Sequence, residues 1–137
     1  MRDGRPYGMT VSSFTSVSLD PPLILICIDR RCGFVADLLA GVTFAVNVLR
    51  EDQQLLAVRF STPPELGRFS NMATREAEGG ALLLEDVVGA LICEVTEIFP
   101  GGDHLIVIGG VIEVRQFSGR PLVWCNSGYH CLPVFGD

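Results

Sequence analysis

The sequence has little charge, and its basic residues are outnumbered. Only 19% of its 137 residues are charged, and ten basic against sixteen acidic residues give a net charge of -6. A net negative charge weakens attraction to polyphosphate, which argues against nucleic-acid binding. The hydrophobic content of 48% is ample for a core, and we expect residues 1–137 to form a single domain. Sparse surface charge also predicts that some apolar surface is buried against a second copy.

Long apolar runs and closely paired cysteines are also missing. No stretch approaches the roughly 20 apolar residues of a membrane span, so we expect no membrane association. The five cysteines form no CxxC pair, which argues against a zinc site. Cys27 and Cys93 lie in apolar runs, where a free thiol behaves as a small hydrophobe. With no signal peptide before the first predicted strand, the expected compartment is a reducing cytoplasm.

The common motifs of hydrolases and nucleotide-binding proteins are absent. The sequence contains no GxSxG, HExxH, GxxxxGK[ST] or GxGxxG motif. Its only two histidines, His104 and His130, exclude a catalytic metal held by several imidazoles of one chain. If the protein is an enzyme, we therefore expect a bound organic cofactor to supply the chemistry.

Short strand-like segments are abundant. A continuous apolar run at 21–29 predicts a strand buried on both faces. Helical spacing predicts two short helices, and the glycine- and proline-rich stretch 63–80 is interpreted as a loop. This pattern favours a small antiparallel barrel with helical decorations. Helices are expected at 32–42 and 51–61, and further strands at 43–49, 81–85, 90–99, 104–114, 121–125 and 128–135.

Hydroxyl side chains are concentrated near the start of the chain. Six of the nine positions from Thr10 to Ser18 carry one. The apolar alternation loses phase between Val11 and Phe14, which indicates a bend or bulge near Ser12 and Ser13. Unpaired backbone groups and small hydroxyls there suit the polar edge of a flat heterocycle. The alternative is an edge strand whose hydroxyls face water.

The segment "CIDRRCG" is a second candidate. Arg30 and Arg31 follow a predicted buried strand and precede a predicted helix, and Gly33 permits close approach of the backbone. Two guanidinium groups beside helix N-terminal amides form a natural phosphate site. A solvated turn after the strand is the alternative.

Four segments together carry a family resemblance: "GMTVSSFTSVSLDPPLILICIDRRC", "TFAVNVLREDQQLLAVRFS", "GGDHLIVIGGV" and "GRPLVWCNSGYHCL". In this order and spacing they resemble the flavin reductases that supply reduced flavin to two-component monooxygenases. The resemblance implies a mainly β fold, an antiparallel Greek-key FMN-binding split barrel with two short helices. Relatives usually have a helix and a strand before "DGRPYGMT", so we expect these two elements to be missing here, either because the start is misplaced or because the absence is real.

The same resemblance implies a set of site residues. Thr10, Val11, Ser12 and Ser13 would lie along the pyrimidine edge of the isoalloxazine. His104 would act beside the nicotinamide as the catalytic residue, although capping of its turn is the alternative. Cys32 stands where many relatives have Ser or Thr, so a weaker thiol donor replaces a hydroxyl. The remaining cofactor-binding residues implied by the family are Cys27, Ile28, Asp29, Arg30, Arg31, Cys32, Gly33 and Phe34 around the phosphate, Asn47, Arg68 and Phe69 along the flavin, and Tyr129 near the place where the nicotinamide stacks on the flavin.

The implied activity is that of an NAD(P)H:flavin oxidoreductase. Hydride would pass from NADH or NADPH to FMN or FAD near the interface of a homodimer, and reduced flavin would diffuse to a partner monooxygenase. Two alternatives stay open: a flavin-binding protein without reductase activity, and an electron-transfer flavoprotein that retains its FMN. Tyr7 and Trp124 are assigned to the core or an interface and do not separate these.

Overall fold

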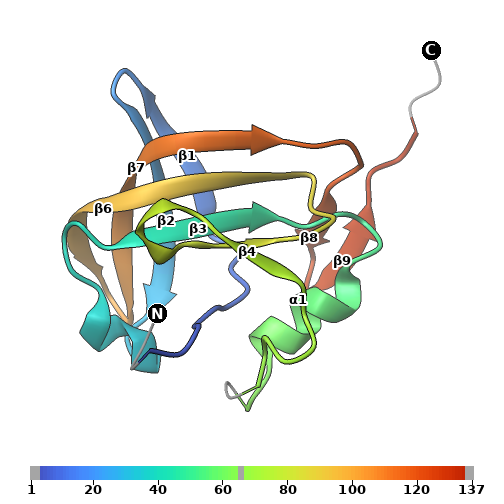
Figure 1. Cartoon of the computed structure of the whole chain (residues 1–137), viewed down its shortest axis with the longest axis horizontal. Coiled ribbons are helices and arrows are strands. Elements are labelled where there is room, and N and C mark those ends of the chain that lie inside the picture. The colour runs from blue at the N-terminus through green and yellow to red at the C-terminus, as the bar shows by residue number, and fades with distance from the viewer. Residues whose placement is uncertain (1–3, 65–66, 135–137) are drawn as a thin grey trace.

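A five-stranded antiparallel sheet forms the centre of the computed structural model, which describes residues 4–64 and 67–134 (Figure 1). Its strands follow the order β1-β2-β7-β6-β3, and two separate two-stranded ribbons, β4-β5 and β8-β9, accompany it. The predicted mainly antiparallel β class is confirmed. The strands are β1 (Phe14–Leu19), β2 (Pro22–Asp29), β3 (Thr43–Val48), β4 (Thr74–Glu76), β5 (Leu82–Leu84), β6 (Gly89–Gly101), β7 (His104–Gln116), β8 (Leu122–Cys125) and β9 (Gly128–Cys131).

The helical segments differ from expectation in two places. The predicted second helix is confirmed as α1 (Gln54–Ser61), but the first is only a 3-10 turn, η1 (Gly33–Asp37). It ends because Leu38 takes an extended conformation (φ -84°, ψ 100°) and is buried in the core. The loop predicted for 63–80 is wrong at its end, where β4 pairs with β5 and a second 3-10 turn, η2 (Glu78–Gly80), follows.

Burial along β2 alternates, so the prediction that both of its faces are buried is wrong. Ile24, Ile26 and Ile28 are 5%, 8% and 2% exposed, whereas the residues between them are half-buried. The core lies on one face of β2, where Cys93 and Val107 are fully buried with the isoleucines. Burial raises the pKa of the Cys93 thiol to about 11, which keeps it protonated and confirms its assignment as a small hydrophobe.

The irregularity predicted near Ser12 and Ser13 takes the form of a bend. Ser12 lies in a bend, and β1 begins only at Phe14. A separate register shift against β2 falls between Ser16 and Ser18. The Ser13 carbonyl still accepts from the Cys27 N–H of β2, and the chain leaves the sheet before it, so the backbone of Val11 and Ser12 is free of the strand ladder.

The segment before β1 passes between two peripheral elements. Figure 1 shows η1 on one side of this segment and α1, with β8 and β9 nearby, on the other. Tyr7 stacks on Phe34 of η1, with ring centroids 4.9 Å apart, and Thr10 contacts α1 by hydrogen bonds. The segment thus forms one wall of the space beneath the sheet. No helix in the described part of the chain is long and apolar enough to cross a membrane.

Candidate functional site

A cavity of about 690 Å³ lies between the sheet, the segment before β1, and α1. Its size is typical of small-molecule and cofactor sites. Aliphatic residues of β2, β3 and β7 contribute to its walls. Aromatic rings are the other main component, because three ring pairs place all six of their members along the cavity: Tyr7 with Phe34, Phe60 with Phe69, and Trp124 with Tyr129.

The hydroxyls of the N-terminal segment have separate roles. The Thr10 hydroxyl donates to the carbonyl of Ala57 in α1 at 2.7 Å. The Ser13 hydroxyl donates to the Cys27 carbonyl at 3.1 Å and accepts from its N–H, which ties it to β2. Ser12 lines the cavity, and within the described chain neither Ser12 nor Val11 makes a hydrogen bond. Free polar groups of this wall are therefore concentrated at Val11 and Ser12.

Asn47 lies on the cavity wall and also joins two strands. Its Nδ2 donates to the Leu82 carbonyl at 3.1 Å, and its Oδ1 accepts from the Leu84 N–H at 2.9 Å. The side-chain amide thus reproduces the backbone pairing that β3 and β5 do not make directly. Both ends of this amide are already used within the chain.

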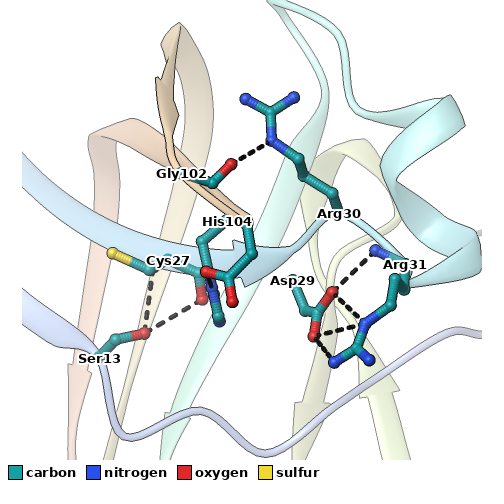
Figure 2. Close-up of polar contacts among 8 residues, drawn as sticks. Ser13, Cys27, Asp29, Arg30, Arg31, Gly102 and His104 are labelled. Carbon is teal, nitrogen blue, oxygen red and sulfur yellow. Dashed lines mark hydrogen bonds and ion pairs between the residues drawn. The ribbon is translucent and has the colours of Figure 1, made fainter.

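Arg30 and Arg31 extend in different directions from the end of β2 (Figure 2). Arg30 Nε donates to the Gly102 carbonyl at 2.8 Å, and its terminal nitrogens make no hydrogen bond within the described residues. Arg31 forms a forked ion pair with Asp29, with Nη2 2.7 Å from Oδ2. Hydrogen bonds from the Arg31 side chain and backbone hold the pKa of Asp29 far below its usual range. Of the predicted phosphate pair, Arg30 has both terminal nitrogens free and no paired carboxylate among the described residues, whereas the charge of Arg31 is offset by Asp29.

His104 lies at the start of β7, opposite Asp29 of β2. Its Nδ1 is 2.7 Å from Asp103 Oδ1, and this contact lowers the pKa of Asp103. The side chain is 42% exposed and is not part of the cavity wall. Figure 2 shows it close to the β2 end that carries Asp29. The structure therefore groups His104 with the charged residues at the sheet end.

Arg68 and Phe69, adjacent in sequence, face different surroundings. Phe69 lines the cavity. Arg68 is buried and donates to the backbone carbonyls of Gly8 and Thr62, so its guanidinium serves the chain itself. At the other end of the N-terminal segment, Cys32 Sγ lies 2.6 Å from the Tyr7 hydroxyl.

The residues proposed from the sequence fall into two groups. Eight of them line the cavity: Thr10, Val11, Ser12, Ile28, Phe34, Asn47, Phe69 and Tyr129. The others lie outside its lining: Ser13, Cys27, Asp29, Arg30, Arg31, Cys32, Gly33, Arg68 and His104. Tyr7 and Trp124 were missed as cavity residues, although Trp124 pairs directly with Tyr129 across β8-β9 and this register could have indicated it.

Chemically, the cavity suits a planar aromatic group with one polar edge. The aromatic rings and aliphatic chains provide apolar surfaces, and Val11 and Ser12 provide unused hydrogen-bonding groups at one wall. The described lining contains Asp37 as its one charged residue, so the chain itself brings little acid–base chemistry to the cavity. A ligand there would have to carry its own reactive centre.

Comparison with known proteins gives a consistent result. The family model described as "Flavin reductase like domain" matches residues 1–133. The chain is 40% identical over 127 residues to an NADH-dependent FAD reductase of Streptomyces globisporus, covering 90% of this chain and 70% of that protein. It is 33% identical over 131 residues to the stachydrine N-demethylase reductase subunit Stc3 of Rhizobium meliloti (strain 1021), covering 96% of this chain but only 56% of that subunit.

The fold also resembles that of a solved oxidoreductase. The similar structure is the Streptomyces globisporus C-1027 NADH:FAD oxidoreductase SgcE6 in complex with NAD and FAD fragments. The TM-score is 0.91 at 33% sequence identity, and the match covers 98% of this chain and 82% of that one. The likeness therefore extends over nearly all of the present chain.

Proposed function

The chain belongs to the flavin reductase-like domain family, and on that premise we propose that it is an NAD(P)H:flavin oxidoreductase supplying reduced flavin to a partner monooxygenase. The observation that carries the proposal is the 690 Å³ cavity with three aromatic pairs and a polar bend at Val11 and Ser12. Support for the substrates comes from the similar NADH:FAD oxidoreductase, whose structure holds NAD and FAD fragments.

The residues present fit a flavin. An isoalloxazine needs apolar contact on its faces and hydrogen bonds along its pyrimidine edge, and the cavity offers both. Val11 and Ser12 would hold that edge, since their polar groups are unused within the described chain. Arg30, whose terminal nitrogens are free, would bind the phosphate of FMN or FAD.

The bound flavin supplies the acceptor for the hydride of NADH or NADPH. The chain's own contribution is alignment and exclusion of water, because the cavity walls are mainly apolar. The Ser12 hydroxyl and the Val11 and Ser12 N–H groups would stabilise negative charge that develops on the ring. His104, held by Asp103, would orient the nicotinamide carboxamide from the start of β7.

Further features support a homodimeric assembly and a cytoplasmic location of the protein. We infer a homodimer with flavin near the interface because large apolar side chains such as Ile112, Val114 and Phe117 are 56%, 64% and 52% exposed. All five cysteines are free thiols, which supports a reducing cytoplasm. The chain is also 34% identical over 132 residues to the reductase component of the 4-nitrophenol 4-monooxygenase/4-nitrocatechol 2-monooxygenase of Rhodococcus opacus, which supports a monooxygenase partner.

Flavin titration combined with an NADH assay tests the function. Trp124 is the only tryptophan and lines the cavity, so FMN or FAD binding should quench its emission. NADH oxidation that requires added free flavin is the expected result. Quenching without NADH oxidation would instead support a flavin-binding protein. Tightly retained flavin with turnover only on a protein acceptor would support the electron-transfer alternative, and no quenching would contradict all three.

A further inference from the structure

Arg68 is a buried cation whose hydrogen bonds within the described part of the chain all go to backbone carbonyls. It is 8% exposed, and its Nη1 and Nη2 donate to the carbonyls of Gly8 at 2.9 Å and Thr62 at 3.0 Å. Among the described residues no carboxylate lies within ion-pair distance of it, and its buried Nε has no hydrogen-bond partner. Burying a guanidinium without a counter-charge is costly. Its contacts therefore point to a positional role that offsets the cost.

Gly8, one of the two residues that Arg68 holds, is packed against aromatic rings. A Cβ added there would lie 2.8 Å from Phe69 Cζ and 2.9 Å from Phe60 Cε1. These two rings pack edge to face with centroids 4.9 Å apart, and both line the cavity. Any side chain at this position would push the segment away from α1 and the rings. Glycine is thus required by the close approach.

The same segment continues directly into the polar wall of the cavity. Two residues after Gly8, Thr10 is bound to α1 through its N–H to the Phe60 carbonyl and its hydroxyl to the Ala57 carbonyl. Val11 and Ser12 follow at once with their free polar groups. Their position is consequently set by how residues 8–10 are anchored. Arg68 and Gly8 anchor the N-terminal end of this segment, and β1 follows at its other end.

We propose that Arg68 and Gly8 are positioning residues of the flavin site, which fix Val11 and Ser12 at the polar edge of the ring. The inference rests on the proposed function, because it assigns these residues a role toward the same ligand. Arg68 is thus assigned an indirect role toward the flavin, in place of the direct contact expected from the sequence. Arg68 acts through the Gly8 carbonyl, and Gly8 acts by admitting Phe60 and Phe69.

The first experiment compares Arg68→Met with Arg59→Met. Arg59 anchors the same loop by donating to the Gly67 and Ser70 carbonyls but does not reach residue 8, so it is a matched control. Flavin dissociation constants are measured by quenching of Trp124, and folding is monitored by thermal unfolding. Arg68→Met should raise the constant roughly tenfold or more, and Arg59→Met should change it by no more than about twofold.

The absorption spectrum of the flavin bound to each variant, measured at saturation, is a second readout. A variant that is merely less stable would not shift this spectrum. Displaced donors at Val11 and Ser12 should shift the visible band in Arg68→Met but not in Arg59→Met. Arg68→Lys should recover part of the affinity, because one ammonium can reach the Gly8 carbonyl but lacks the fork that serves two carbonyls. Equal effects of Arg68→Met and Arg59→Met, or an unchanged spectrum at saturation, would overturn the proposal.

If Arg68→Met does not fold, the Gly8→Ala variant tests the positioning role instead. It should raise the dissociation constant and shift the same band, and its effect should be less than additive with that of Arg68→Lys, since both act through one segment. Wild-type affinity in Gly8→Ala would overturn the inference while leaving the proposed function intact. Absence of quenching in the wild-type protein would overturn both.

Discussion

Two adjacent arginines illustrate how much a single residue's environment decides. Arg30 and Arg31 have the same side chain and follow the same strand, yet only Arg31 is paired with a carboxylate. The charge of Arg31 is offset by Asp29, whereas Arg30 has two nitrogens free for a ligand. The phosphate-binding capacity of this turn is therefore concentrated on one residue.

Arg30→Met should weaken FMN binding more than Arg31→Met does. Loss of a charge-assisted contact to phosphate predicts a rise of roughly tenfold in the FMN dissociation constant for Arg30→Met. Riboflavin, which has no phosphate, should bind both variants like the wild-type protein. Comparing the two ligands by Trp124 quenching isolates the phosphate contribution. The interpretation fails if riboflavin loses affinity to the same extent as FMN.

The depressed pKa of Asp29 makes the free energy of unfolding dependent on pH. Its pKa is depressed in the folded protein by hydrogen bonds from Arg31, below the ordinary aspartate value of about 3.9. Its contribution to the free energy of unfolding is thus present above about pH 4 and is lost as the pH falls through the folded-state pKa. Asp29→Asn should be less stable than wild type at neutral pH, with a difference that narrows below about pH 4.

Urea unfolding at neutral and acidic pH measures that difference. The control is Asp29→Asn made in an Arg31→Met background, where the partner is already absent. There the substitution should produce a much smaller pH-dependent change. A difference that persists unchanged in acid would show that the ion pair with Arg31 does not lower the pKa as described.

At the scale of elements, β3 and β5 are joined by a side chain. The Asn47 amide bonds the Leu82 carbonyl and the Leu84 N–H, and it thereby fixes the position of the β4-β5 ribbon against the sheet. Ala81, Leu83, Ala90 and Ile92 form a small buried cluster between this ribbon and β6. The ribbon therefore covers a second face of the sheet, away from the main core.

Asn47→Ala should lower the free energy of unfolding by about 2 kcal/mol, because two backbone groups lose their partners. Asn47→Asp keeps the acceptor for the Leu84 N–H but loses the donor to the Leu82 carbonyl, so an intermediate loss is expected. Chemical denaturation of the three proteins gives the comparison. The described role is contradicted if both variants retain wild-type stability.

The elements also show where sequence patterns are informative. Strands β6 and β7 were predicted at nearly their observed positions because long apolar alternation is a local signal. The helix predicted at 32–42 shortened to η1 because burial of Leu38 in the core outweighed helical spacing. β4, with no buried residue, had no apolar pattern to reveal it, and its partner β5 determines its conformation.

At the scale of the molecule, exposed apolar surface predicts self-association. Leu19, Leu55 and Val114 are 95%, 85% and 64% exposed, an unusual cost for a protein with so few charged residues. We expect sedimentation equilibrium to yield twice the mass of one chain. The association should be weakly dependent on salt, because apolar burial rather than charge would drive it. A monomer at all concentrations would contradict the inferred homodimer.

The sequence by itself determined the β class, most strand positions, the bend near Ser12 and the family, because these depend on local apolar periodicity and on ordered motifs along the chain. Only the tertiary structure decided which hydroxyl is free and which arginine is neutralised. Those outcomes depend on partners distant in sequence, such as Ala57 for Thr10 and Gly8 for Arg68. The aromatic cavity also depends on the tertiary structure, since folding alone brings Tyr7, Phe60 and Trp124 to one cavity.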